Sequence, residues 1–172
     1  MTPALDGRLN HYYTSPNNEM TAPSLGTTAR LAKALAHVAR LRILAMLGGG
    51  ELCVCQMTAV LRLAPSTVSA HLSELRRSGF IAERKDAKWV RYRMTDDGAL
   101  RRLVREALSL IEADPQIRQD AGVVRTLRRI PVERLCRAGL DLDAVGIRGR
   151  TPASLRAGAR GRPHAKGIRH DR

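Results

Sequence analysis

The sequence predicts a mostly α-helical domain of the α+β type with one small β-hairpin, and three observations support this class. Hydrophobic residues make up 44% of the 172 residues, which is enough for a core. Only one Phe and one Trp are present, so the core must consist of Leu, Val, Ile and Ala, as in packed helices. Apolar residues follow a helical period over most of the chain, and the period of a strand only between Ile81 and Met94.

Three helices are predicted before residue 62. An apolar stripe at positions i, i+4 and i+7 predicts the first, and it consists of Leu31, Leu35 and Val38. The pattern continues in a second helix, either through Leu41, Leu44 and Leu47 or through Ile43 and Leu47, and the three glycines at 48–50 end this helix. The segment 53–61 is then expected to form a short third helix.

The segment 61–79 has the pattern of a helix-turn-helix. Residues 63–65 form the turn, and Pro65 suits the first turn of the next helix, where its missing N–H costs little. That helix runs to about Ser78, and Gly79 ends it. Its apolar positions repeat at i, i+4 and i+7, so we expect them to face the core: Val68, Leu72 and Leu75.

Two alternating segments, 81–85 and 90–94, flank a polar turn and predict a β-hairpin. Thr and Asp residues at 95–97 are suitable N-caps for a helix over 98–113. Further helices are expected at 116–129 and 132–138. A helix-turn-helix followed by a hairpin is a winged helix-turn-helix, whose second helix enters the major groove of DNA while the hairpin lies on the adjacent backbone.

These patterns divide the chain into four parts. Residues 1–28 are rich in Asn, Thr, Ser, Pro and Gly and are expected to be a disordered leader. Residues 29–113 form the winged helix-turn-helix, which binds DNA and dimerises, and 114–145 form a helical C-terminal extension. Residues 146–172 are rich in Arg, Gly and Pro and are expected to be a disordered tail.

The charge balance indicates an anionic partner. The chain has 30 Lys and Arg against 16 Asp and Glu, a net charge of +14, which is typical of proteins that bind nucleic acid. The tail carries eight of the basic residues and one acid, so half of the excess lies outside the predicted domain. The rest of the chain is still basic.

Other classes of protein are disfavoured. No run of 18 apolar residues predicts a membrane span, and the N-terminus lacks the pattern of a signal peptide, so we expect a cytoplasmic protein without a membrane partner. Three cysteines do not make a disulfide framework. The sequence also lacks GxGxxG, GxxxxGK[ST] and HExxH motifs, and we therefore expect no enzyme.

The polar face of the helix after Pro65 is the candidate DNA-reading surface. Short hydroxyl side chains let a helix sit deep in the groove, although an ordinary solvated face would show the same pattern. Basic residues of the hairpin would contact phosphates. The candidate residues are Ser66, Thr67, Ser69, Ala70, Ser73 and Arg77 on the helix, and Arg84, Lys85, Lys88, Arg91 and Arg93 on the hairpin.

Cys53 and Cys55 lie one residue apart immediately before the helix-turn-helix. Closely spaced thiols can form a site for a soft metal or metalloid. A merely buried or redox-active pair is the alternative interpretation. Successive residues of an ideal helix turn by about 100°, which would place the two side chains about 200° apart. Both thiols could then bind one ion only if the start of the helix were distorted.

Taken together, four segments resemble the ArsR/SmtB family of metal-sensing repressors: Ala34 to Leu44, Glu51 to Cys55, Ser66 to Gly79 and Lys88 to Arg93. The resemblance covers residues 29–113. It implies a homodimeric winged helix-turn-helix that binds double-stranded operator DNA and represses a resistance operon until an inducer binds. The thiol segment is most similar to those of the arsenical and antimonial sensors, which implies As(III) or Sb(III) as the inducer and no organic cofactor.

The chain departs from the pattern of this family in two respects that bear on the site. Thr58 stands where the arsenical sensors with three thiols on one helix have the third, and no cysteine precedes Cys53, as the cadmium/lead sensors would require. Cys136 is the remaining cysteine and the candidate third ligand, from a C-terminal helix of either subunit. A small apolar core residue is its alternative role.

Several alternatives remain open from the sequence. A thiol redox-sensing repressor of the same fold, a cadmium/lead sensor and a non-specific nucleic-acid-binding protein that uses the tail are compatible with the pattern. A zinc sensor is disfavoured because the helix predicted over 98–113 contains no His. We expect the helices with apolar stripes at 31–38 and 100–111 to pair across a two-fold axis in the homodimer.

Overall fold

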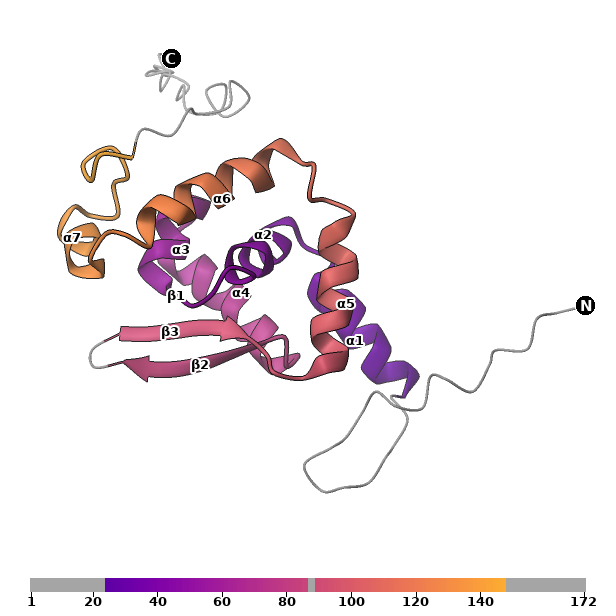
Figure 1. Cartoon of the computed structure of the whole chain (residues 1–172). Coiled ribbons are helices and arrows are strands. Elements are labelled where there is room, and N and C mark those ends of the chain that lie inside the picture. Colours follow the sequence, from indigo (N-terminus) through magenta and orange to yellow (C-terminus); the bar gives the residue numbers. More distant parts are fainter. Residues whose placement is uncertain (1–23, 87–88, 148–172) are drawn as a thin grey trace, which may run out of the picture.

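The computed structural model describes residues 24–86 and 89–147, and within them the chain forms seven helices and a small sheet that lies along one edge of the helical part (Figure 1). The first half contains α1 (Leu25–Leu35), α2 (Val38–Leu47), β1 (Leu52–Cys53), α3 (Val54–Leu61) and α4 (Pro65–Arg77). The second half contains β2 (Ile81–Asp86), β3 (Trp89–Met94), α5 (Gly98–Ser109), α6 (Pro115–Leu127) and α7 (Val132–Arg137).

The helix-turn-helix is formed by α3 and α4, as predicted. α3 ends at Arg62, whose left-handed φ of 55° turns the chain, and Pro65 occupies the first turn of α4. Val68, Leu72 and Leu75 are fully buried in the main apolar cluster, so the predicted inward face of α4 is confirmed.

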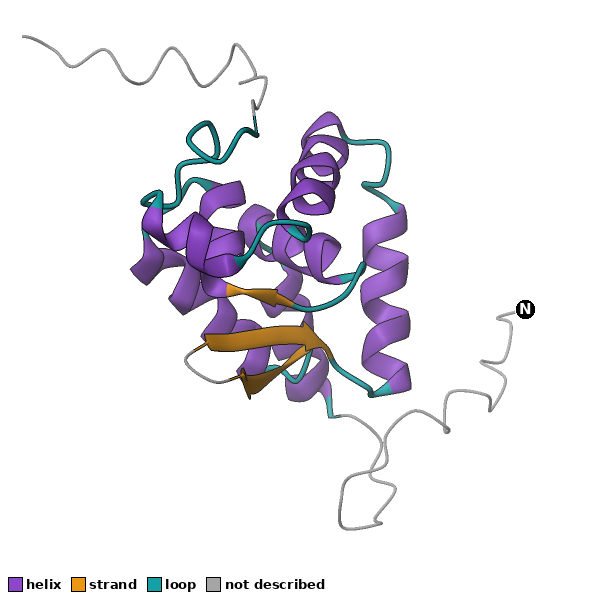
Figure 2. Ribbon diagram, turned by 60° about the vertical axis from the view of Figure 1, so that its left-hand side comes forward, coloured by secondary structure: helices purple, strands orange, loops and turns teal. Residues whose placement is uncertain are grey.

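The sheet has the order β1-β3-β2 and is antiparallel throughout. Gly79, with a φ of 77°, turns the chain from α4 into β2. Figure 2 shows the short strand β1 beside the hairpin. Cys53 of β1 pairs with Arg91 of β3, so the thiol segment is hydrogen-bonded to the hairpin. The helix-turn-helix and this hairpin together make a winged helix-turn-helix.

The C-terminal extension packs against the first helices rather than standing apart. On α6, Asp120 binds Arg42 of α2 through two hydrogen bonds of 2.6 and 2.9 Å. The carbonyl oxygen of Leu127 accepts a hydrogen bond from Gln56 of α3 at 3.4 Å. Figure 1 shows α6 along one side of this core and α7 at the opposite side of the molecule from α5. The predicted unit 114–145 thus contributes to the same core as the winged domain.

Two boundaries near the N-terminus differ from the sequence prediction. α1 begins at Leu25, inside the predicted leader 1–28, because the Ser24 hydroxyl accepts the N–H of Thr27 and caps the helix. Val38 was assigned to the stripe of the first helix, but it begins α2 and is 73% exposed. The reason is His37, which caps α2 by accepting the N–H of Ala39 at Nδ1.

Two boundaries near the C-terminus differ as well. α5 ends at Ser109 instead of residue 113. Ile147 lies in the main apolar cluster, although the tail was predicted to begin at residue 146. The tail beyond Ile147 and the leader before Ser24 lie outside the described residues. No helix of the described part of the chain has the length and apolar character needed to span a membrane.

Candidate thiol site and nucleic-acid interface

The polar face of α4 is open to solvent. Because the three apolar residues of α4 point into the core, helical geometry turns the opposite face outward. Arg77, at the C-terminal end, forms an ion pair with Glu74 at 2.6 Å while its own side chain stays 73% exposed. All predicted reading residues of this helix are exposed: Ser66, Thr67, Ser69, Ala70, Ser73 and Arg77.

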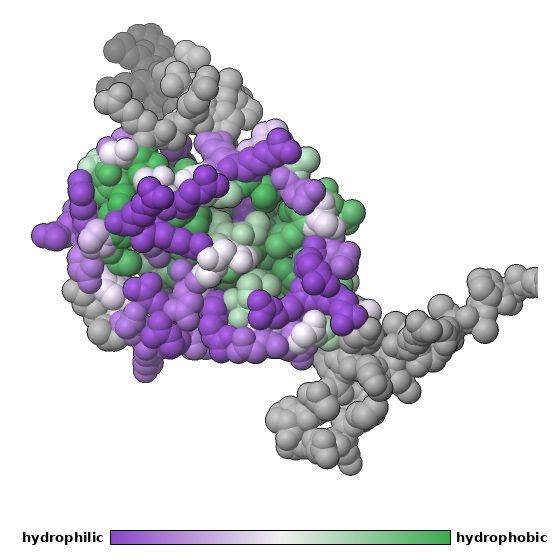
Figure 3. Space-filling model, in the orientation of Figure 1, coloured by the Kyte–Doolittle hydropathy of each residue, from purple (hydrophilic) through white to green (hydrophobic). Residues whose placement is uncertain are grey.

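The basic residues of the hairpin are held by acidic neighbours. Three of the predicted phosphate contacts form ion pairs of 2.5 to 2.7 Å: Arg84 with Glu51, Arg91 with Asp86, and Arg93 with Asp96. These arginines lower the pKa of both Glu51 and Asp86, mainly through the hydrogen bonds. Figure 3 shows a hydrophilic band along the lower part of the molecule, where the hairpin lies in Figure 1. Lys85 is exposed, and Lys88 lies outside the described residues.

Cys53 stands outside the helix that was predicted to contain it. It belongs to β1, with φ −88° and ψ 163°, and is the N-cap of α3. Pairing with Arg91 keeps it extended, and the side chain of Gln56 accepts its N–H at 3.0 Å. The prediction of a helix over 53–61 was therefore wrong at its first residue. The separation of about 200° applies to an ideal helix and not to this arrangement.

The three thiols meet at Cys55. Cys53 is buried, while Cys55 in the first turn of α3 and Cys136 on α7 are half-buried. After burial, the thiols of Cys136 and Cys53 also raise the pKa of the Cys55 thiol, so three separate elements bring their sulfurs near one another. The thiol cluster is defined here as Cys53, Cys55 and Cys136.

Burial disfavours the thiolate forms of two cysteines of this cluster, Cys53 and Cys55. Burial first, and then the hydrogen bond and charge interactions with its two neighbours, raise the pKa of Cys55 to about 12. Burial also raises the pKa of Cys53, although hydrogen bonds from the backbone of Gln56 and Cys55 act in the opposite direction. Burial therefore favours the neutral form of the Cys53 and Cys55 thiols.

The cluster as it stands does not form a metal-binding group. Within residues 24–86 and 89–147, no three His, Cys, Asp or Glu side chains are arranged to hold a metal ion. The donor set nevertheless fits a thiophilic metalloid, because sulfur is the ligand that such elements prefer. Thr58, one turn after Cys55 on α3, has a buried hydroxyl without a hydrogen-bond partner among these residues.

Sequence reasoning missed two sets of contacts that the C-terminal helices make near the thiol segment. Arg128 of α6 donates hydrogen bonds to the carbonyl oxygens of Met46, Gly49 and Gly50, at the end of α2. Trp89 of β3 donates its indole N–H to the carboxylate of Glu133 on α7 at 3.0 Å. The sequence indicated helices after residue 115, but a helical period does not show which residues Arg128 and Glu133 bind.

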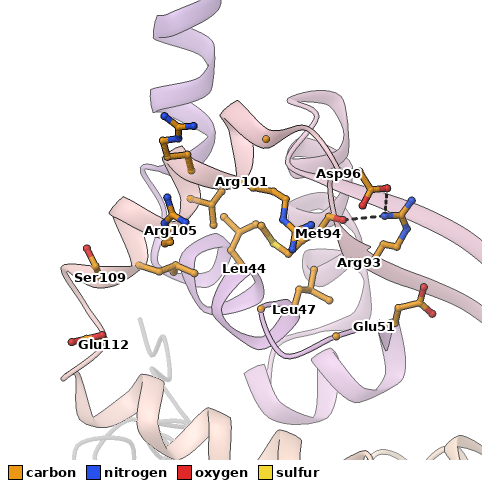
Figure 4. Close-up of a pocket in the computed structure, with 16 residues that line it drawn as sticks. Leu44, Leu47, Glu51, Arg93, Met94, Asp96, Arg101, Arg105, Ser109 and Glu112 are labelled. Atoms are coloured by element: carbon orange, nitrogen blue, oxygen red, sulfur yellow. Dashed lines mark hydrogen bonds and ion pairs between the residues drawn. The ribbon is translucent and has the colours of Figure 1, made fainter. Parts of the chain in front are cut away.

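A concave region of about 800 Å³ lies away from the thiol cluster, between α2, α5 and the end of β3. Figure 4 shows Leu44 and Leu47 at its apolar wall, and Arg101 and Arg105 of α5 at its edge. It contains no cysteine and no histidine, and one of its acids, Asp96, is paired with Arg93.

Comparison with known proteins identifies the family of this chain. Residues 37–83 match the model of the family described as "Bacterial regulatory protein, arsR family". The biofilm growth-associated repressor of Agrobacterium fabrum is 39% identical over 88 residues, which cover 51% of this chain and 74% of that protein. The chain belongs to the ArsR family.

Other similar proteins match shorter segments of the chain. The arsenical resistance operon repressor of Escherichia coli is 43% identical over 67 residues, or 38% of this chain and 57% of that protein. Among solved structures, reduced HlyU from Vibrio cholerae has a TM-score of 0.46 at 34% identity and matches 49% of this chain and 88% of that one. The chain spans about half to three fifths of the arsenical-resistance relatives that it matches. These relatives are described as transcriptional regulators, not as enzymes.

Proposed function

We propose that this ArsR-family chain is a DNA-binding transcriptional repressor that leaves its operator when As(III) or Sb(III) binds Cys53, Cys55 and Cys136. The contact of the Cys55 thiol with the other two thiols carries this proposal. β1, α3 and α7 each supply one sulfur, so a single bound atom would join three elements of the fold.

The chemistry of arsenous acid suits protonated thiols. Three S–H groups can exchange with the three hydroxyls of As(OH)₃, so that three S–As bonds form and three molecules of water leave. No net proton is released in this exchange. A divalent cation such as Cd²⁺ would instead have to displace the thiol protons into solvent, which costs more where burial raises the pKa. The same raised pKa slows oxidation, because the thiolate is the species that reacts with peroxide.

The DNA-binding surface consists of the exposed face of α4 and the hairpin. Short side chains such as Ser66 and Ser69 let the helix approach base edges, and exposed cations such as Arg77 and Lys85 can neutralise phosphates. Three hairpin arginines have to exchange an acidic partner for a phosphate, and we therefore expect them to contribute less than their charge alone suggests.

A homodimer would place two such surfaces on one face of DNA. Leu103 of α5 and Leu110, the C-cap of α5, are 40% and 86% exposed, and a second copy of the chain would cover them. The stripes predicted at 31–38 and 100–111 are only partly available, since Leu31 and Leu100 are buried within the protomer. Two recognition helices about 34 Å apart would read an inverted repeat.

The decisive experiment is a titration of the DNA-bound protein. A duplex selected by the protein from a random library is labelled, and release is followed by fluorescence anisotropy on addition of arsenite, antimonite, cadmium or zinc. We expect arsenite and antimonite to release the DNA at lower concentration than the two divalent cations. Release by none of the four would contradict the proposal, and release by peroxide alone would favour a redox sensor.

Variants of the thiol cluster test the site itself. Cys53→Ser and Cys55→Ser should bind DNA as the wild type does but fail to release it with arsenite. Cys136→Ser should show the same loss if the third sulfur comes from α7. Thr126→Ser is the matched control, because this exposed residue of α6 lies outside the cluster. Unimpaired release from Cys53→Ser and Cys55→Ser would remove the cluster from consideration.

A further inference from the structure

The short helix α7 touches both the thiol cluster and the hairpin. Glu133 and Cys136 are three residues apart, so they lie on the same side of α7. The Cys136 thiol lies close enough to the Cys55 thiol to interact with it, and Glu133 accepts the indole N–H of Trp89 at 3.0 Å. The same side of α7 thus carries the third thiol, Cys136, and the carboxylate that binds Trp89, the first residue of β3.

The sheet brings Trp89 to the same side as Cys53. Directly opposed residues of antiparallel strands point to the same face, and Cys53 lies opposite Arg91. Trp89 precedes Arg91 by two residues on β3, so its side chain emerges on that face too. The thiol segment and the indole therefore share the face of the sheet that meets α7.

Packing makes α7 a unit that moves as a whole. Val132 and Leu135 are buried, and α7 packs against α3. A helix of six residues is held internally by its backbone hydrogen bonds, so a displacement of Cys136 carries Glu133 with it. Ligation of the three sulfurs to one atom would fix Cys136 relative to Cys53 and Cys55, and would thereby act on the position of α7.

We infer that the Glu133–Trp89 hydrogen bond couples ligand binding at the thiol cluster to the position of the hairpin, and that α7 connects the two. This inference rests on the function proposed above. Closure of three thiols on one atom shifts α7, the carboxylate of Glu133 moves with it, and the start of β3 follows. The hairpin then loses its fit to the DNA backbone. Trp89 and Glu133 are positioning residues, and neither touches the inducer.

The test separates coupling from binding. DNA affinity is measured by anisotropy with and without saturating arsenite, and arsenite uptake is measured independently by equilibrium dialysis. For Glu133→Ala, we expect arsenite uptake and inducer-free DNA affinity within about twofold of the wild type; for Trp89→Phe, in the hairpin, we expect this of arsenite uptake, and its DNA affinity with arsenite is compared with its own inducer-free value. Arsenite should weaken DNA binding at least tenfold in the wild type but less than about threefold in these variants, within the usual range of allosteric couplings.

Two further variants exclude a merely structural effect. Glu133→Gln keeps an oxygen that can accept the indole N–H, so it should retain most of the coupling. Arg134→Gln changes an exposed residue of the same helix and should behave as the wild type does. Trp89 is the only tryptophan, so its fluorescence reports the movement directly. Arsenite should change its emission in the wild type and in Glu133→Gln, but not in Glu133→Ala.

The outcomes distinguish the two proposals. If arsenite releases DNA equally well from the wild type, Glu133→Ala and Trp89→Phe, the inference is overturned while the sensor function stands. An equal change in Trp89 emission in the wild type and Glu133→Ala would overturn it as well. If arsenite binds the wild type but releases no DNA, or does not bind at all, the sensor function fails and the proposed transmission fails with it.

Discussion

Arg42 of α2 and Asp120 of α6 form an ion pair that is 16% and 4% exposed, the most buried of the ion pairs described. The guanidinium donates two hydrogen bonds to the carboxylate, and Gln116 donates a third at 2.9 Å. A helix of the C-terminal extension is thereby joined to the second helix of the winged domain. The extension and the winged domain should consequently unfold together.

Asp120→Asn should lower the free energy of unfolding by about 3 kcal/mol, since it leaves the charge of Arg42 buried without a counterion. Urea denaturation followed by circular dichroism measures this change. Glu106→Gln is the matched control, because Glu106 and its partner Arg105 are about 70% exposed and such pairs contribute little. A separate unfolding transition for the extension, or equal effects of the two substitutions, would contradict this view of the interface.

The elements that sequence predicted well depend on local signals. Pro65, the helical period of α4 and the alternation around residues 81–94 each involve neighbours a few positions apart, and these elements were confirmed. The docking of α6 was not predicted, because Arg42 and Asp120 are 78 residues apart and no pattern in either segment indicates that the two residues pair.

The candidate site shows the same division. The spacing of Cys53 and Cys55 marked the thiol segment, but its strand conformation depends on pairing with β3, which is a tertiary effect. The contact of Cys136 with Cys55 likewise follows from the packing of α7 on α3. The sequence could offer Cys136 only because no other cysteine was left, and it gave no reason to connect Trp89 with Glu133.

Thr58→Val should raise the free energy of unfolding by about 1 kcal/mol. The hydroxyl of Thr58 is buried without a hydrogen-bond partner in the described part of the chain, and replacing it by a methyl group removes the cost of its desolvation. Thermal and urea denaturation of the two proteins give the difference. Thr126→Val, at an exposed position on α6, should leave stability within about 0.5 kcal/mol. Destabilisation by Thr58→Val would mean that the hydroxyl has a partner in solution, such as a buried water.

Acidification should destabilise the protein partly through His71. Burial, then His37 and Arg40, lower the pKa of His71 below its ordinary value of 6.5, and its ring lies 4.3 Å from that of His37. The unfolded chain therefore takes up the proton at higher pH than the folded one, and stability falls as the pH drops below about 6.5.

The measurement compares urea denaturation of the wild type and His71→Gln at about pH 7.5 and 5.5. The wild type should lose more stability between these values than the variant does. Glu51 and Asp86 have lowered pKa values, so they titrate below this window and do not obscure the difference. Identical losses in the two proteins would show that His71 is protonated as easily in the folded state as in the unfolded chain.

Arg77→Gln should weaken DNA binding and reduce its dependence on salt. Each phosphate that a cation neutralises contributes about −0.9 to the slope of log K against log salt concentration, so loss of one contact should flatten the slope by about that amount. Glu74 competes with phosphate for Arg77 at 2.6 Å, and Glu74→Gln should accordingly strengthen binding at low salt. Anisotropy titrations between about 50 and 200 mM salt measure both effects.

Arg125→Gln is the control for charge alone, because Arg125 is exposed on α6 rather than on the recognition helix. It removes the same charge from the protein as Arg77→Gln does, so long-range attraction to DNA decreases equally in both variants. Only a direct phosphate contact makes the slope of the Arg77 variant flatter than that of the Arg125 variant. Equal slopes for the two would place Arg77 away from the DNA backbone and require a different orientation of α4 in the groove.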